Sequence, residues 1–528
     1  MREFIVAVDV GTGSARAGVF DLGGMQMARV VTAIGVHQPD ALFYEQNSAE
    51  IWQAVAQSVR GACEQAGVQP DEVVALGFDA TCSLVLRDGN GTPVAASKSG
   101  PDQQDTMLWM DHRAIAEANE ISSSSDPTLD RFGGYMSPEM QPPKLLWLKR
   151  NLPESWARAG LIFDLCDYLT WRATGSTSRS HSALAAKWAY EPDAPGAYPE
   201  RFYQRIGLED ARLRTGLPEH ATPSCEPIGT LSEAAAKELG LSTKCIVAAG
   251  LIDAYAGTIG VFCQSPEEAP THAAALIAGT SSCVVVLRRC REEKPGVWGG
   301  FCGAALPGLW LMEAGQSSSG SLLDFLLRRH DAGGPPSLTL HMKILDRIAE
   351  RIAQEGPAYG RPIAVLPDLH GSRGPMPDPA QTGAFSGLSL EGGFDNLCRL
   401  YWRTCVGLAC GIRHVLENMP DAEMIATLLM GGGLAAHPLI PQLYADMTGR
   451  TVRVDETRDP VLLGTMINAA VAAGRYSSHA EAAANLTGST TKTIAPRPDI
   501  HTHLAADYAA YHAMMRHRDE LARILAVT

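Results

Sequence analysis

Two apolar runs separated by a short turn open the chain. Residues 4–10 are apolar except for Asp9, and residues 15–20 form a second, largely apolar run that contains Arg16. Such runs are typical of buried strands, so the pattern predicts two strands joined by a turn at residues 11–14. The two glycines and two hydroxyls of this turn can bring donors close to an anion, which makes it a candidate phosphate-binding hairpin. An ordinary glycine-rich hairpin has the same pattern.

The same pattern recurs in the second half of the chain. Residues 273–287 read as strand, Gly-Thr-Ser turn and strand, and a third small-residue turn at 431–433 follows another apolar strand. Two such hairpins predict duplicated lobes that face a shared ligand. The polar, proline-rich stretch 264–270 is the candidate boundary, which gives lobes at residues 1–264 and 265–528.

Strand and helix patterns alternate between the hairpins, which predicts an α/β fold. Asn47 and Glu50 form a capping-box pattern, so a helix is predicted from there to about Gly67. The loop-rich region 172–225 has the character of an insertion. The other predicted strands are 73–78, 84–87 and 245–250, and the other predicted helices are 144–150, 163–171, 254–261, 462–471 and 505–525.

Length and charge narrow the classes of function. At 528 residues the chain is too long for a single core, and no apolar run approaches the ~20 residues that a membrane span requires. The first residues enter a strand directly, so we expect no signal peptide. The net charge of −14 argues against a nucleic-acid partner, and it requires any phosphate site to rely on local dipoles and a metal ion.

The cysteine and histidine patterns indicate no structural metal site and no disulfide framework. Twelve cysteines are scattered without a CxxC pair, which favours a reduced, cytoplasmic protein. The fifteen histidines form no HExxH motif, and the pair at His501 and His503 fits the start of a solvated helix better than a metal site.

Several segments together resemble the FGGY carbohydrate kinases, within the superfamily of sugar kinases, Hsp70 and actin, and are closest to its D-ribulokinase branch. The resemblance covers nearly the whole chain, from Asp9 to about Val471. The segments are GFDATCSLVL (77–86), WMDHRA (109–114), GGYMSPEMQPPKLLWLKRNL (133–152), FDLCDYLTWRATG (163–175), AKWAY (186–190) and GLIDAYAG (250–257).

This resemblance implies two ribonuclease-H-like lobes with a central cleft that closes around a sugar and Mg-ATP. It also implies that Asp253 is the catalytic base and that Asp9 lies near Mg²⁺. The other implied site residues are Asp9, Thr12, Gly13, Ser14 and Arg16 in the first phosphate loop; Gly279, Thr280 and Ser281 in the second; Gly432 and Gly433 in the adenosine motif; and Ala80, Lys187 and Glu313 at the ketopentose, with Asp111 and Arg113 in a motif at the sugar end.

Some of these residues have structural interpretations as well. Asp253 also fits a helix N-cap, and Asp111 with Arg113 also fits a structural ion pair. Lys187 also fits a lysine that extends from an apolar patch. Because buried sugar hydroxyls need polar partners, Asp79 joins Asp111, Lys187 and Glu313 as candidate sugar contacts, and Trp109 is a candidate stacking residue.

The expected activity is ATP-dependent phosphorylation of D-ribulose to D-ribulose 5-phosphate. L-ribulose, D-xylulose and four- or five-carbon polyols remain open as substrates. An Hsp70- or actin-like ATPase and a catalytically silent sugar sensor are the alternatives from other classes. His437 stands where the family often has Asn near the adenine, which leaves donor selectivity open. A homodimer is common in the resembling family.

Overall fold

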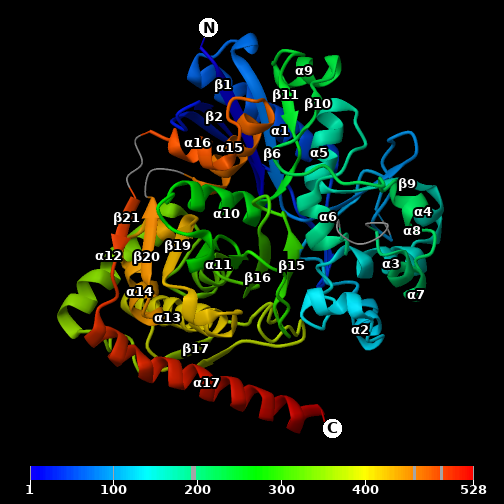
Figure 1. The fold of residues 1–528 in the computed structure, drawn as a ribbon. Helices are drawn as coiled ribbons and strands as arrows, with labels where there is room; N and C mark the ends of the chain where they lie inside the picture. The colour runs from blue at the N-terminus through cyan, green and yellow to red at the C-terminus, as the bar shows by residue number, and fades with distance from the viewer. Residues whose placement is uncertain (1, 99, 192–197, 456–458, 488–490, 527–528) are drawn as a thin grey trace. The chain divides into compact units, whose positions relative to one another are not determined.

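The fold is taken from a computed structural model that describes residues 2–98, 100–191, 198–455, 459–487 and 491–526 (Figure 1). The chain forms two units. The first comprises Met1–Pro266, Arg288–Met312 and Thr457–Ser489, and the second comprises Glu267–Leu287, Glu313–Glu456 and Thr490–Thr528. The predicted boundary at residue 264 lies close to the end of the first long segment. The prediction assigns residues 265–528 to one lobe, whereas Arg288–Met312 and Thr457–Ser489 belong to the first unit.

A mixed sheet in the order β10-β11-β6-β1-β2-β3 organises the first unit, and β12 also pairs with β6. Strand β1 is antiparallel to β2 and parallel to β6, and every residue of β1 is buried. A second sheet has the order β4-β5-β8-β7-β9. The strands are β1 (Phe4–Val10), β2 (Ser14–Asp21), β3 (Gln26–Ala33), β4 (His37–Asp40), β5 (Phe43–Gln46), β6 (Val73–Ala80), β7 (Leu84–Asp88), β8 (Thr106–Met107), β9 (Ala159–Asp164), β10 (Pro227–Thr230), β11 (Ile246–Ala248), β12 (Leu251–Ile252) and β15 (Trp298–Cys302).

Helices cover both faces of the main sheet (Figure 1). Val8 and the other even-numbered residues of β1 share a hydrophobic cluster with α1, whereas α15 packs on β1 and β6 from the opposite face and also contacts α10. Because successive strand residues alternate between faces, Asp9 belongs to the α15 face. The helices are α1 (Ser48–Ala66), α2 (Ile115–Ser123), α3 (Gln141–Asn151), α4 (Pro153–Arg158), α5 (Leu165–Thr174), α6 (His181–Lys187), α7 (Glu200–Arg205), α8 (Ala211–Thr215), α9 (Glu233–Leu239), α10 (Asp253–Cys263), α15 (Pro460–Ala472) and α16 (His479–Ala484).

The second unit repeats this strand pattern. Its main sheet includes the order β16-β14-β13-β19-β20-β21, in which β13 is antiparallel to β14 and parallel to β19, as β1 is to β2 and β6. The predicted duplication of the strand–turn–strand pattern is therefore present. The elements are β13 (Ala273–Ala278), β14 (Ser282–Arg288), β16 (Trp310–Gln316), β17 (Ala364–Leu366), β18 (Ala384–Ser386), β19 (Thr427–Gly431), β20 (Thr451–Asp455), β21 (Thr491–Ile494), α11 (Gly320–Arg329), α12 (Leu338–Glu355), α13 (Phe394–Asn418), α14 (Leu439–Thr448) and α17 (Pro498–Ala526).

Predictions of individual helices and strands can be compared with the structure one by one. The Asn47 side chain accepts hydrogen bonds from the backbone N–H groups of Ala49 and Glu50, so α1 begins as predicted. The Glu50 side chain does not complete the capping box, because its carboxylate accepts a hydrogen bond from the Gly35 N–H at 2.8 Å. The predicted helix 163–171 is wrong at its start, because its first two residues pair with β7 as the end of β9.

Two further predictions, on membrane spans and on the region 172–225, can be compared with the structure. In the part of the chain that is described, no helix is both long enough and apolar enough to cross a membrane. The region predicted as an insertion, 172–225, contains α6, α7 and α8, and its residues 192–197 lie outside the described residues.

Candidate active site

The first predicted phosphate loop connects β1 to β2 and is held in shape by side chains from other elements. The Gly11 N–H donates to the Ser14 carbonyl at 3.0 Å, which closes the turn. The Trp109 indole N–H donates to the Thr12 hydroxyl at 3.0 Å, and the Gln46 amide donates to the Thr12 carbonyl at 2.9 Å. Trp109 therefore braces the loop. A Cβ added at Gly13 would meet open space, so the turn has room for a bulky anion.

Carboxylates gather beside this loop. Strand pairing aligns Asp9 with Arg16 on one side and with Asp79 on the other, and Asp9 and Arg16 form an ion pair. Arg16 also lies 3.4 Å from Asp459, whose side chain caps α15. The Thr465 hydroxyl of α15 donates a hydrogen bond to Asp79. Segments that are far apart in sequence therefore build one acidic cluster within the first unit.

The acidic cluster brings three carboxyl groups beside two guanidinium groups, Arg16 and Arg29, of which Arg29 lies 3.3 Å from Asp459. Its buried carboxyl groups resist ionisation. Asp9 and Asp79 are fully buried. Burial raises the pKa of Asp9 to about 7, although the Arg16 guanidinium acts against this increase. Burial raises the pKa of Asp79 well above its usual range, and the Asp9 carboxylate adds to the effect.

This cluster of carboxyl groups suits a divalent cation. No group of three or more His, Cys, Asp or Glu side chains is arranged to hold a metal ion among the described residues. Mg²⁺ is commonly held by one or two carboxylates together with water and substrate phosphates, so a single buried carboxylate is sufficient on the protein side. Asp9 fits this role, because a cation would favour its ionised form.

Asp253 begins α10, directly after the short strand β12. Leu251 and Ile252 of β12 pair in parallel with Asp79 and Ala80 of β6. Asp253 therefore follows β12 at the same edge of the sheet at which β6 ends, where ligands bind in open α/β sheets. Its partly exposed carboxylate accepts a hydrogen bond from the Ala254 N–H at 2.7 Å. Asp253 is the first helical residue, since the N-cap position belongs to Ile252.

Two glycines set the position of α10. A Cβ at Gly260 of α10 would overlap the Pro460 carbonyl, and a Cβ at Gly464 of α15 would overlap the Ala256 carbonyl. The two helices pack backbone to backbone as a result, which fixes the helix that carries Asp253.

Asp111 and Arg113 are held in a buried ion network. The Arg113 guanidinium lies 2.7 Å from Asp111 and 2.9 Å from Glu45, and none of these side chains is exposed. Both oxygens of Asp111 are occupied, because Oδ2 also accepts from the Tyr44 N–H at 2.7 Å and Oδ1 accepts from the Arg113 backbone N–H at 3.0 Å. Direct sugar contact by these two residues stays a prediction, whereas their structural ion pair is present.

Lys187 lies at the end of α6 and is buried beside an aromatic ring. Its ammonium nitrogen is 4.8 Å from the Trp298 ring centroid. The neighbouring Asp164 is fully buried, and this burial raises its pKa to about 6. Lys187 is thus a buried cation in a polar setting of the first unit, and its contact with a sugar stays a prediction.

The sequence analysis did not identify Lys144, which holds the start of the WMDHRA segment through hydrogen bonds to its backbone. Its ammonium donates to the Leu108 carbonyl at 2.7 Å and to the Trp109 carbonyl at 3.2 Å. Burial lowers the pKa of Lys144 to about 8. A lysine among apolar helix residues was the available signal. Asp459 was also missed, although an Asp-Pro pair before an apolar helix is an N-cap signal.

The second predicted phosphate loop joins β13 to β14 in the second unit. The Gly279 N–H donates to the Ser281 carbonyl at 2.9 Å, which closes this turn one residue shorter than the first loop. The Thr280 carbonyl accepts from the N–H of Ser319 at 2.9 Å and from the Ser321 hydroxyl at 3.0 Å. The start of α11 therefore supports this loop.

Glu313 is a buried carboxylate of β16 in the same unit. It lies 3.8 Å from the Arg373 guanidinium and accepts a contact from the Cys283 thiol at 3.4 Å. This placement rules out an exposed loop glutamate, because Glu313 is only 4% exposed. Its role at a sugar stays a prediction.

The predicted adenosine motif follows β19. Gly432 has a φ of +105°, and a Cβ there would overlap the Ala278 carbonyl, so glycine is required at this close approach. Gly433 begins a short 3-10 helix. The buried His437 closes this turn, with one ring nitrogen 3.3 Å from Asp346 and the other accepting from the Leu439 N–H at 3.2 Å. Both nitrogens of His437 are thus occupied within the second unit.

Comparison with known proteins covers the whole chain. The N-terminal domain of the FGGY family of carbohydrate kinases matches residues 4–260, and the C-terminal domain of that family matches residues 274–473. An FGGY carbohydrate kinase domain-containing protein of Danio rerio is 38% identical, with 99% of each chain covered. A D-ribulokinase of Saccharomyces cerevisiae is 34% identical, with 89% of this chain and 71% of that protein covered.

Solved structures show the same fold. A xylulose kinase of Lactobacillus acidophilus superposes with a TM-score of 0.80 at 19% identity, and a gluconate kinase of the same organism gives 0.79 at 18%, each with 98% of both chains covered. The predicted two-lobed α/β fold is confirmed by these likenesses. The two domain matches, with relatives at 38% and 34% identity, show that the chain belongs to the FGGY family of carbohydrate kinases.

Proposed function

We propose that the chain transfers the terminal phosphoryl group of ATP to the primary hydroxyl of a ketopentose, with D-ribulose as the substrate and D-ribulose 5-phosphate as the product. The observation that carries the proposal is the 34% identity to a D-ribulokinase over most of the chain. The carboxylates at the strand ends of the first unit and the two glycine-rich loops supply groups that this chemistry needs.

In the proposed reaction, Asp253 accepts the proton of the attacking hydroxyl. Its carboxylate follows a strand end and is partly exposed, so a substrate hydroxyl can approach it. The helix that carries Asp253 is fixed by close packing. This packing holds the carboxylate in the alignment that catalysis requires.

The phosphate loops and Arg16 offset negative charge on the transferred phosphoryl group. Backbone N–H groups and hydroxyls of Thr12, Gly13 and Ser14 serve one loop, and those of Gly279, Thr280 and Ser281 serve the other. Mg²⁺, when bound, neutralises phosphate charge, and Asp9 is the residue that would hold it. Gly433 leaves room for the nucleoside, because a Cβ there would meet open space, and Gly432 lets the turn approach the Ala278 carbonyl closely; His437 lies in the same turn.

Sugar selection is assigned to buried polar groups. Asp79, Lys187 and Glu313 are the proposed contacts, with Ala80 at the end of β6 leaving space for the sugar. Asp111 and Arg113 are proposed to act by holding the WMDHRA segment in place. A buried polar group left unpaired costs about 1–3 kcal/mol, so a sugar with one inverted hydroxyl loses affinity at such a site.

The test is an ADP-release assay with every ketopentose and its polyols, run on the wild type and on Asp253→Asn. D-ribulose should give the highest kcat/KM, and Asp253→Asn should lose turnover by orders of magnitude while it still binds ATP. A higher kcat/KM for another pentulose refutes the substrate. ADP release without sugar indicates an ATPase, and no release indicates a sugar sensor.

We also propose a cytoplasmic location. None of the twelve cysteines forms a disulfide in the described part of the chain, which suits a reducing compartment. The homodimer stays a prediction.

A further inference from the structure

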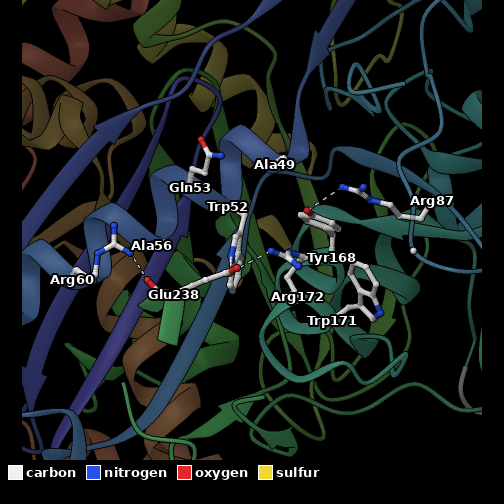
Figure 2. Close-up of a pocket in the computed structure, with 11 residues that line it drawn as sticks. Ala49, Trp52, Gln53, Ala56, Arg60, Arg87, Tyr168, Trp171, Arg172 and Glu238 are labelled. Carbon is white, nitrogen blue, oxygen red and sulfur yellow. Dashed lines mark hydrogen bonds and ion pairs between the residues drawn. The ribbon is translucent and has the colours of Figure 1, made fainter. Parts of the chain in front are cut away.

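A pocket of about 460 Å³ lies in the first unit (Figure 2). Its walls come from α1, β7, α5 and α9. Trp52 of α1, which lines it, belongs to the hydrophobic cluster with the even-numbered residues of β1. The Asp9 carboxylate faces the other side of the same sheet, so this pocket is separate from the first phosphate loop. We call it the α1–α5 pocket.

Positive charge exceeds negative charge in the α1–α5 pocket. Arg172 lies 3.3 Å from the Glu238 carboxylate, and Arg87 lies 3.0 Å from Asp105. Arg60 donates to the Glu238 backbone carbonyl, and no carboxylate of the described residues lies at ion-pair distance from it. The lining therefore holds three guanidinium groups and one carboxylate, Glu238, while Asp105 pairs with Arg87 from outside the lining; the net charge of the protein is −14. An anion would balance the remaining charge.

One buried donor in the wall of the pocket has no hydrogen-bond partner. Arg87 is only 4% exposed, and one of its terminal nitrogens pairs with Asp105 and donates to the Ser48 hydroxyl and to the Tyr168 hydroxyl, the latter at 3.1 Å. Its Nε has no partner among the described residues. Figure 2 shows the Arg87 guanidinium turned toward Tyr168 at the pocket. Since an unpaired buried donor is costly, a ligand acceptor or a water would complete this site.

Aromatic rings supply the other part of the lining. The Arg172 guanidinium lies 5.1 Å from the Trp52 ring centroid, and the Trp52 indole N–H donates to Glu238 at 2.5 Å. Trp171 packs beside Tyr168 with ring centroids 5.8 Å apart. These contacts fix both tryptophans. Ring faces next to guanidinium groups suit a ligand that has a carbon skeleton and an anionic end.

We propose that the α1–α5 pocket binds a small organic phosphate. Arg60 and Arg172 hold the phosphate, which guanidinium groups recognise through paired N–H donors. The carbon skeleton lies against Trp171, and the volume is within the range of metabolite sites. The proposal does not depend on which sugar the kinase phosphorylates.

The test is calorimetric titration of the full-length protein with D-ribose 5-phosphate, inorganic phosphate and D-ribose. The proteins compared are the wild type, the double variant Arg60→Gln/Arg172→Gln, and Arg201→Gln as a matched loss of an exposed arginine outside the pocket. D-ribose 5-phosphate should bind the wild type, and the double variant should weaken Kd by at least about tenfold, since it loses charge-assisted hydrogen bonds. Arg201→Gln should leave Kd unchanged.

A second variant separates charge from folding. Arg60→Lys keeps a cation at the exposed position. It should therefore bind D-ribose 5-phosphate better than the single variant Arg60→Gln, which is prepared for this comparison. Equal affinity of the wild type and the double variant overturns the proposal, because the ligand then binds elsewhere. No binding at millimolar concentrations also overturns it, and so does equal affinity for inorganic phosphate, which would leave the aromatic lining without a role.

Discussion

The buried Asp9 carboxylate should make the stability of the first unit fall as pH rises. Its pKa is raised from 3.8 to about 7, chiefly by burial. Between these values the folded state holds a proton that the unfolded chain has released. This contribution to the free energy of unfolding is therefore fully present below pH 3.8 and is lost as the pH rises through about 7. At 1.36 kcal/mol per pKa unit, the full difference is roughly 4 kcal/mol.

The variant Asp9→Asn isolates this contribution, because asparagine has a similar size and stays neutral at every pH. Between pH 5 and pH 8 the wild type should lose about 3 kcal/mol relative to the variant. Burial is the largest cause of the raised pKa of Asp79, and this cause is the same in the wild type and in the variant. Urea-induced unfolding at several pH values without Mg²⁺ measures the difference. Asp71→Asn, which removes an exposed carboxylate of the same unit, is the control.

Parallel pH profiles for the wild type and Asp9→Asn would refute this reasoning, because Asp9 would then titrate alike in the folded and unfolded states. Adding Mg²⁺ and ADP tests the second part of the argument. A cation at Asp9 favours the ionised carboxylate, so Mg-ADP should stabilise the wild type more at pH 8 than at pH 6 and should stabilise Asp9→Asn less.

Three further substitutions, with Gly433→Ala as a control, test the packing of the site. Gly432→Ala places a side chain at a φ of +105° and against a backbone carbonyl, so it should lower both Tm and ATP affinity. Gly433→Ala places its side chain in open space and should change Tm little. Thermal melts with and without ATP compare the two variants. Arg113→Met leaves two buried carboxylates unpaired and should cost about 3–5 kcal/mol in urea unfolding. Gly464→Ala should cost about 1–3 kcal/mol and lower kcat, because it displaces the helix that carries Asp253; kcat and Tm together check it.

The sequence predicts the elements that are defined by local signals. The apolar runs on either side of residues 11–14 and 279–281 are the two hairpins, and the N-cap at Asn47 begins α1. The FGGY motifs also identified the family, which the two domain matches confirm. These features need only a few neighbouring residues to be recognised.

The rest depends on contacts between distant segments. Residues 163 and 164 are strand because β7 pairs with them, although the residues around them favour a helix. The hydrogen bond from Thr465 to Asp79 joins positions 386 residues apart, so the return of α15 to the first unit cannot be seen in a local pattern. The α1–α5 pocket likewise draws on four separate elements.

Transfer of phosphate from ATP to a sugar carbon is the central claim, and NMR of the reaction tests it most directly. The protein is incubated with ATP, Mg²⁺ and D-ribulose labelled with ¹³C at C5. The account predicts ADP in equal amount to a new phosphate monoester, with carbon–phosphorus coupling at the labelled carbon. ADP with inorganic phosphate and an unchanged sugar, or no turnover at all, would contradict it.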